Sequence, residues 1–282
     1  MLFYNRLFVA IGSGGDRLAI KCFKFAIIIV LVFLISSCTV TKQFLNRQGE
    51  SGHKTTLPVE PAELLEMAYY CDEAYENTDN KFEFLNDNQF SYQVKQDQGV
   101  TILIFRGTSN GNNILTDIDF RPFEDKQLSE KWGTKVFLHR GFRDAAMFLE
   151  KDIKTNYKLE KTVYLTGHSL GGAIAQIVGF WLDREGYNVQ IYTFGSPKVT
   201  TTFLGNRPIH YRVVVNNDPV TFLPIYPYVH SGIRIDAKTL DWWEYDEYGK
   251  FTEIDGRDHS IKYYLKTLSD NHVFPQLCDQ CK

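Results

Sequence analysis

Short, continuously apolar segments alternate along this chain with longer segments in which apolar residues recur at helical spacing. The short segments predict buried strands and the longer ones predict helices with one apolar face. Strands are predicted at 99–105, 162–165, 189–194 and 211–215, with a further brief apolar piece at 135–138, and helices at 61–75, 141–154, 170–183 (closed by Gly186) and 260–268. Apolar strands separated by helices predict a single α/β domain with a mostly parallel central sheet and helices on both faces.

The N-terminal residues follow a different pattern. Phe25–Ile35 is an uncharged apolar run of eleven residues, which is shorter than the ~20 residues that a membrane-spanning helix needs. The basic residues Arg17, Lys21 and Lys24 shortly precede the run. This arrangement is typical of a secretory signal peptide. The Ile-Ser-Ser-Cys segment at 35–38 resembles a bacterial lipobox, which implies that Cys38 is lipidated and becomes the mature N-terminus.

These features divide the chain into three parts. We expect residues 1–37 to be a lipoprotein signal peptide, residues 38–60 to be the lipidated cysteine and a flexible polar tether, and residues 61–282 to be the folded domain. The alternative is an uncleaved membrane anchor, and in both cases the domain faces a compartment outside the cytosol. The expected location is the bacterial cell envelope, as a membrane lipoprotein in the outer membrane if the source is Gram-negative.

Composition narrows the functions that are open to this chain. The 282 residues are 44% hydrophobic and 23% charged, which is ordinary for a globular protein and excludes a disordered or fibrous chain. With 31 basic and 34 acidic residues the net charge is −3, so we expect no nucleic-acid partner. Five cysteines are too few for a disulfide scaffold, and Cys278-x-x-Cys281 lacks the second pair that a zinc site needs. We expect no metal and no cofactor, and we predict no protein partner.

A candidate nucleophile lies between a predicted strand and a predicted helix. Residues 167–171 read Gly-His-Ser-Leu-Gly, which fits the pattern G-x-S-x-G. In that context a sharp turn exposes a serine hydroxyl above the sheet, and the glycines let the strand and the helix approach. The helix that begins at Leu170 directs its free N–H groups toward the same place. We therefore predict that Ser169 is a catalytic nucleophile, and the alternative is a glycine-rich turn with an incidental serine.

A serine nucleophile needs a carboxylate that orients its histidine base, and in sheets of this kind the chain order is Ser, acid, His. Asp218 directly follows the last predicted strand, where parallel sheets place catalytic side chains. We therefore predict that Asp218 is the acid, and the alternative is that Asn-Asp-Pro is only a turn there. Asp236, Asp241 and Asp255 are weaker candidates because none ends a clear predicted strand.

Seven histidines are candidates for the base. One adjoins the nucleophile inside the turn, where it is poorly placed to accept the proton, and three others precede the acid: these are His168, and then His53, His139 and His210. His259 lies at the start of the last predicted helix, where a loop can bring it over the sheet. We predict that His259 is the base, with His230 and His272 as the alternatives.

Several motifs in a fixed order identify a family. The motifs are Phe105-Arg106-Gly107-Thr108, Leu138 to Phe142, Gly167 to Gly172, Tyr192 to Pro197, Asn217 to Val220 and Asp258-His259. With them the chain resembles the class 3 lipases, a fungal lipase-like branch of the α/β hydrolases, over about residues 61–270. The resemblance implies the α/β-hydrolase fold and a lipid or ester substrate. It also assigns the triad independently to Ser169, Asp218 and His259.

The resemblance further implies an oxyanion hole and a lid. In the family the residue after the F-R-G run donates its backbone N–H, and that residue here is Thr108; the alternative is a capping residue after a strand. The N–H of Leu170 is the second donor, and Arg106 is expected to be a buried structural cation. Residues 109–120 fall where the family keeps its lid, and their few large apolar residues predict only weak interfacial activation.

Three functions follow as hypotheses. The first is a lipid-anchored serine carboxylic ester hydrolase of lipase type, which cleaves acylglycerols or short-chain esters and meets the membrane through its lipid anchor. The second is a phospholipase A1 or a membrane-directed effector lipase, since the acyl pocket and the lid set the substrate. The third is a catalytically silent envelope-binding lipoprotein, against which the complete triad argues.

The resemblance also bears on the cysteines. Extracellular fungal relatives tie the first helix of the domain to the C-terminal tail with a disulfide, which here implies a bond between Cys71 and Cys278. A local bond between Cys278 and Cys281 is one alternative. Free thiols, with Cys71 buried on its helix, are the other.

Overall fold

The computed structural model describes residues 57–76, 80–84, 88–107, 119–215, 218–244 and 256–270. Its helices are α2 (Pro61–Glu76), α4 (Lys126–Trp132), α5 (Arg140–Asn156), α6 (Leu170–Arg184) and α7 (Ile261–Asp270), and its 3₁₀ turns are η1 (Pro219–Phe222) and η2 (Gly256–His259). Its strands are β1 (Asn80–Phe84), β2 (Asn88–Asp97), β3 (Val100–Arg106), β4 (Pro122–Glu124), β5 (Phe137–His139), β6 (Thr162–His168), β7 (Asn188–Phe194), β8 (Ile209–Val214), β9 (Ile233–Asp236) and β10 (Trp242–Trp243). None of the helices within these ranges has the length and apolar character needed to span a bilayer. The predicted signal peptide, Cys38 and most of the tether lie outside the described residues.

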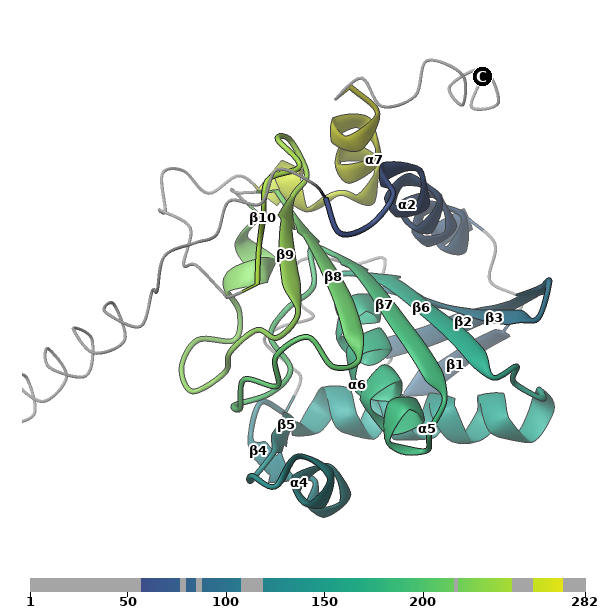
Figure 1. Ribbon diagram of the computed structural model, residues 1–282, viewed down its shortest axis with the longest axis vertical. Helices are drawn as coiled ribbons and strands as arrows, with labels where there is room; N and C mark the ends of the chain where they lie inside the picture. The colour runs from purple at the N-terminus through teal and green to yellow at the C-terminus, as the bar shows by residue number, and fades with distance from the viewer. Residues whose placement is uncertain are drawn as a thin grey trace, which may run out of the picture. The chain divides into compact units, whose positions relative to one another are not determined.

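The central sheet has the strand order β1-β2-β3-β6-β7-β8-β9-β10 (Figure 1). Neighbouring strands are parallel from β3 to β9, whereas β1, β2 and β10 pair antiparallel at the two ends. The mostly parallel sheet that the sequence predicts is therefore confirmed. Because parallel strands share a direction, the carboxyl ends of β3, β6, β7 and β8 meet at one edge of the sheet.

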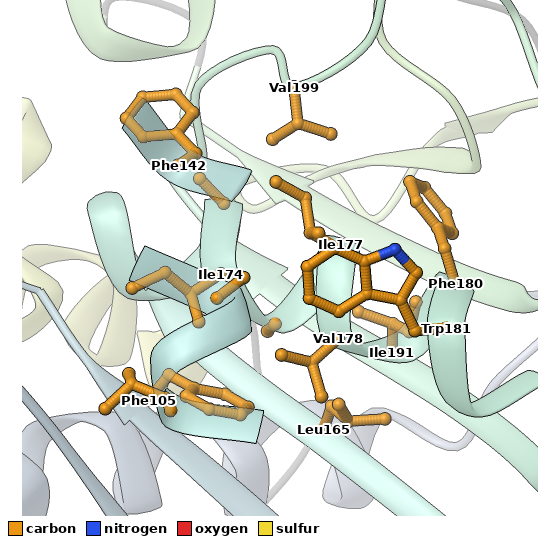
Figure 2. Close-up of a cluster of buried hydrophobic side chains, with 14 of the residues drawn as sticks. Phe105, Phe142, Leu165, Ile174, Ile177, Val178, Phe180, Trp181, Ile191 and Val199 are labelled. Atoms are coloured by element: carbon orange, nitrogen blue, oxygen red, sulfur yellow. The ribbon is translucent and has the colours of Figure 1, made fainter. Parts of the chain in front are cut away.

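Helices cover both faces of this sheet, as predicted (Figure 1). Along β6 the residues alternate between the two faces, so that Val163 and Leu165 belong to the core under α5 and α6 while Tyr164 packs into the core under α2 and α7. This alternation follows from the two-residue period of a strand. Figure 2 shows the first of these cores, in which side chains of α6 lie between the sheet and α5. Every residue of α6 from 170 to 182 is buried, which explains why this helix is apolar on all sides.

The predicted helices and strands are all present, with boundaries that move by a few residues. The elements that the hydrophobic pattern does not predict are the antiparallel strands β1, β2 and β10 at the two ends of the sheet, the short elements α4 and β4, and the buried strand β9. An antiparallel strand toward the end of a sheet needs only one apolar face, so β2 carries polar residues along much of its length. Strand β9 reads Ile-Arg-Ile-Asp and is buried throughout, so its charged residues conceal it from a hydrophobicity argument.

The structure contradicts the bond between Cys71 and Cys278. Cys71 is a free, fully buried thiol, and its Sγ lies 3.2 Å from Oγ1 of Thr166 on β6. It shares the sheet-facing side of α2 with Leu64, Met67, Ala68 and Ala74, so it faces away from any partner outside the helix–sheet interface. Burial raises the pKa of this thiol to about 12, which keeps it protonated and unreactive. Cys278 and Cys281 lie outside the described residues.

Candidate active site

Ser169 occupies the turn between β6, which ends at His168, and α6, which begins at Leu170. Its backbone angles are φ 57° and ψ −129°, a conformation that costs a non-glycine residue about 1–3 kcal/mol. The turn is tight, because a Cβ on Gly167 would lie 2.3 Å from the carbonyl carbon of Gly171. This strand–turn–helix geometry lifts the serine side chain to the carboxyl edge of the sheet.

The structure brings the three predicted catalytic side chains into one hydrogen-bonded line. Nε2 of His259 lies 2.8 Å from Oγ of Ser169, and its Nδ1 lies 2.9 Å from Oδ2 and 3.0 Å from Oδ1 of Asp218. Asp218 is fully buried, so water screens its charge very little. Because a carboxylate only accepts, it holds the imidazole proton on Nδ1 and leaves Nε2 free to accept a proton from the serine.

Two further donors hold the Asp218 carboxylate in place. The N–H of Val220 in η1 donates to Oδ1 over 2.9 Å, and the hydroxyl of Tyr264 on α7 donates to Oδ2 over 2.6 Å. The backbone N–H of Val215 in turn donates to the Tyr264 hydroxyl over 3.2 Å. Burial and the Asp218 carboxylate raise the pKa of Tyr264 well above its usual range, so this hydroxyl remains a donor. No sequence motif marks Tyr264 as a residue of the site.

One of the two predicted oxyanion donors lies within the described residues. Leu170 is the first residue of α6, so its N–H is one of the free N–H groups at the start of that helix. Thr108 lies outside the described residues. The residue before it, Gly107, lies against the nucleophile turn, where an added Cβ would be 2.8 Å from the carbonyl oxygen of His168 and 3.3 Å from Cβ of Ser169. The chain therefore leaves β3 directly beside the nucleophile.

The other described histidines have structural partners. Nε2 of buried His230 donates a hydrogen bond to the carbonyl oxygen of Thr221 over 2.6 Å. This side chain therefore stabilises η1. His139 caps the N-terminus of α5, and Nε2 of His210 lies 2.9 Å from a threonine hydroxyl on β7. Three candidates lie outside the described residues, namely His53, Asp255 and His272.

The weaker candidates for the acid, Asp236 and Asp241, bind groups of a turn after β9. Asp236 does end a strand, β9, but its Oδ1 accepts two backbone N–H groups of the following turn at 2.8 and 3.0 Å. Asp241 accepts the hydroxyl of Thr239 in the same turn.

Arg106 is half-buried instead of buried, and its guanidinium lies 5.5 Å from the ring centroid of Tyr75. Within the described ranges, no group of three or more His, Cys, Asp and Glu side chains is arranged to hold a metal ion.

The order Ser, Asp, His along the chain, met at the carboxyl edge of a mostly parallel sheet, defines a class of protein: the serine hydrolases with the α/β-hydrolase fold. Residues 102–227 match the family described as Lipase (class 3). A little under half of the chain therefore resembles the class 3 lipases.

Relatives of known name agree with this family. The chain is 32% identical over 155 residues to the secreted mono- and diacylglycerol lipase 1 of Fusarium solani, a match that covers 50% of this chain and 45% of that protein. It is 36% identical over 121 residues to toxin TseL of Vibrio cholerae, which covers 39% of this chain and 18% of the toxin. The chain therefore spans less than half the length of these curated relatives.

Solved structures agree with the fold. The triacylglyceride lipase of Rhizomucor miehei superposes with a TM-score of 0.57 at 17% identity, covering 77% of this chain and 100% of that one. A lipase from Rhizopus microsporus var. chinensis gives a TM-score of 0.52 at 20% identity, covering 73% of this chain and 92% of that one. At these identities the likeness concerns the fold alone.

Proposed function

We propose that this protein is a serine carboxylic ester hydrolase of lipase type that cleaves acylglycerols or short-chain esters. The observation that supports the proposal is the hydrogen-bonded line from Ser169 through His259 to buried Asp218. Oγ of Ser169 lies 2.8 Å from Nε2 of His259, and Nδ1 of His259 lies 2.9 Å from Oδ2 of Asp218. A binding protein has no need of this alignment, which places a base on one side of a serine hydroxyl and a fixed carboxylate behind the base.

The reaction follows from the donors and acceptors of the line. Oγ of Ser169 bonds to the ester carbonyl carbon while Nε2 of His259 takes the serine proton, and the carbonyl electron pair moves onto oxygen. The N–H of Leu170, with that of Thr108, stabilises this oxyanion; loss of one such donor costs about 3–4 kcal/mol of the barrier. His259 then protonates the departing alcohol, and an acyl-serine remains. Water repeats the sequence and releases the acid, while Asp218 stays unprotonated throughout.

A lipid substrate is supported by apolar side chains that are exposed near the catalytic acid. Ile225 is 73% exposed and Tyr226 is 91% exposed, on the loop that follows η1 and Asp218. Phe120, which is 65% exposed, adjoins the same loop because its carbonyl oxygen accepts the hydroxyl of Tyr228. Large apolar groups exposed to water on the loop that follows the catalytic acid favour a substrate that presents apolar surface.

A membrane-directed effector lipase, such as a phospholipase A1, is the second candidate. It is favoured by the similarity to toxin TseL, which is 36% identical over 121 residues. The triad does not separate the two candidates, since both attack an acyl ester. The acyl pocket and the lid decide between them, and the lid segment up to residue 118 lies outside the described residues.

We also propose that Cys38 is lipidated and anchors the protein to the membrane of the bacterial cell envelope. The proposal is supported by the Ile-Ser-Ser-Cys segment that follows a short apolar run. Lipid chains attached at this residue would hold the catalytic domain near its substrate through the tether. Expression of wild type and Cys38→Ser in a lipoprotein-processing host, followed by membrane fractionation, tests this; equal distribution of both proteins would refute it.

Labelling and hydrolysis together test the catalytic proposal. The purified mature protein is treated with a fluorophosphonate probe and then assayed on nitrophenyl butyrate, nitrophenyl palmitate, triolein and phosphatidylcholine vesicles, with Ser169→Ala as the control. We expect labelling of Ser169 and hydrolysis of neutral esters, and preferential release of fatty acid from phosphatidylcholine would favour the effector hypothesis instead. A folded wild type that neither labels nor hydrolyses any ester would support the silent envelope-binding lipoprotein.

A further inference from the structure

We propose that His168, the residue beside the nucleophile, is a positioning residue that holds the backbone of His259 through a hydrogen-bonded chain starting at Tyr75. The inference rests on the proposed hydrolase function, to which it adds two residues that take no part in the proton transfers. The sequence excludes His168 as the base and assigns it no other role.

The chain of contacts joins three elements that are far apart in the sequence. Nδ1 of His168 lies 2.8 Å from the hydroxyl of Tyr75 on α2. Nε2 of His168, on the opposite side of the same ring, lies 2.6 Å from the backbone carbonyl oxygen of His259. The tyrosine hydroxyl also receives a backbone hydrogen bond from Gly107, at the end of β3.

The direction of each hydrogen bond is fixed by chemistry. The carbonyl oxygen of His259 can only accept, so Nε2 of His168 carries a proton. Burial, and then the neighbouring His259, lower the pKa of His168 well below its usual range, so the ring is neutral and Nδ1 is an acceptor. The Tyr75 hydroxyl donates to that nitrogen, because burial raises its own pKa above the usual range and keeps its proton. Every donor in the chain therefore faces an acceptor.

This arrangement acts on the base from the side that the acid does not reach. Asp218 holds the imidazole ring of His259 through Nδ1, whereas His168 holds the backbone carbonyl group of His259, so both the side chain and the backbone of the base are held. The two histidine rings lie with their centroids 4.7 Å apart. A neutral His168 at this distance adds no like charge against the imidazolium that His259 becomes during the reaction.

The hydrogen-bonded chain from Tyr75 to His259 also fixes the end of β3, which leads to Thr108. A Cβ on Gly107 would lie 2.4 Å from the Tyr75 hydroxyl, so glycine is required for the close approach of β3 to that oxygen. Both ring nitrogens of His168 have a hydrogen-bond partner. Here one side chain ties α2 and β3 to the loop that carries the base, and we infer that its loss loosens the geometry of the reaction.

Two conservative variants test the proposal. Tyr75→Phe removes only the donor to Nδ1, and His168→Gln keeps both a donor and an acceptor in place of the ring, whereas His168→Leu keeps neither. Tyr192→Phe is the matched control: it removes a tyrosine hydroxyl from the same interface between α2 and the sheet, where that hydroxyl donates to Glu63. Fluorophosphonate titration counts the competent sites in each variant, and kcat and KM on nitrophenyl butyrate are then expressed per titrated site.

We expect kcat per site to fall about tenfold in Tyr75→Phe and about a hundredfold in His168→Leu, with KM within about twofold of wild type, because misplaced reacting groups lower kcat. His168→Gln should recover most of the loss, and Tyr192→Phe should match wild type within about twofold. The double variant Tyr75→Phe/His168→Leu should fall no further than His168→Leu alone, since the two residues act through one chain.

Other results would overturn the proposal. If kcat per titrated site is unchanged in Tyr75→Phe and His168→Leu while only the melting temperature falls, His168 is a core residue without a positioning role. Independent, additive losses would also exclude a single chain. A wild type that neither titrates nor hydrolyses esters would refute the proposed function instead. Imidazole ¹⁵N chemical shifts would then test the hydrogen-bonded chain independently of activity. A proton on Nδ1 of His168 would contradict it, because Nδ1 must accept from Tyr75.

Discussion

Replacing Gly195 with alanine tests whether the catalytic acid is held as tightly as the structure indicates. Gly195 directly follows β7 with φ 57°. A Cβ there would lie 2.5 Å from Oδ2 of Asp218, 3.1 Å from Nδ1 of His259 and 3.1 Å from the hydroxyl of Tyr264. The added methyl group therefore enters the point where the acid, the base and the supporting tyrosine meet.

Two effects of different size follow from this geometry. A positive φ costs an alanine about 1–2 kcal/mol of folding stability. Ordinary contact with a Cβ begins at 3.4 Å, so the Asp218 carboxylate, or the backbone of residue 195, must move by about 1 Å. A displacement of that size in a catalytic group lowers kcat about a hundredfold. We therefore expect Gly195→Ala to be moderately less stable and to lose most of its activity.

Gly205→Ala separates the two effects. Gly205 also has a positive φ, 69°, but nothing lies within 4 Å of the position of an added Cβ. Both variants should lose about 1–2 kcal/mol in urea unfolding, but only Gly195→Ala should lose kcat per fluorophosphonate-titrated site on nitrophenyl butyrate. If both variants keep kcat within about threefold of wild type, the acid is not held rigidly and the reasoning fails.

Three further predictions concern the triad and the buried histidines. Ser169→Ala should abolish ester hydrolysis and leave the melting temperature at or above that of wild type, because it removes only the nucleophile and a methyl group suits the turn no worse; more than a few per cent of residual activity would exclude Ser169. His259→Ala should lower kcat/KM by several orders of magnitude, whereas His230→Ala should act mainly on stability through η1, and the reverse outcome would reassign the base. Burial lowers the pKa of His139 from 6.5 to about 4. Between these two pH values the unfolded state binds a proton that the folded state does not bind. The free energy of unfolding therefore falls as the pH drops from about 6.5 to about 4. His139→Asn, which keeps a side chain suited to capping α5, should flatten that fall by up to about 1.4 kcal/mol per pH unit in urea titrations, and an unchanged slope would contradict this origin.

The sequence by itself determined the features that depend on residues close together in the chain. The turn around Ser169 is readable because the glycines, the strand before it and the helix after it all lie within a short stretch. Asp218 is readable for a related reason, since the carboxyl end of a predicted strand is a defined place in a parallel sheet. His259 is readable from its place at the start of the last predicted helix, and the family resemblance indicates it independently.

Only the tertiary structure decided which polar side chains support that site. Tyr264 reaches Asp218 across 46 positions of the chain, and Tyr75 reaches His168 across 93. Tyrosine and histidine are common on helices and strands, and nothing in their local spacing separates a buried donor from a core residue.

The same reason accounts for the expectations that failed. The direction in which Cys71 points depends on which face of α2 meets the sheet, and that face packs against Thr166 on β6. Asp236 belongs to a strand only because β8 provides the neighbouring hydrogen-bonding edge. In each case the deciding contact joins segments that hydrophobic periodicity treats separately, because periodicity gives the face that a residue occupies within its own element and not the partner that the folded chain brings to it.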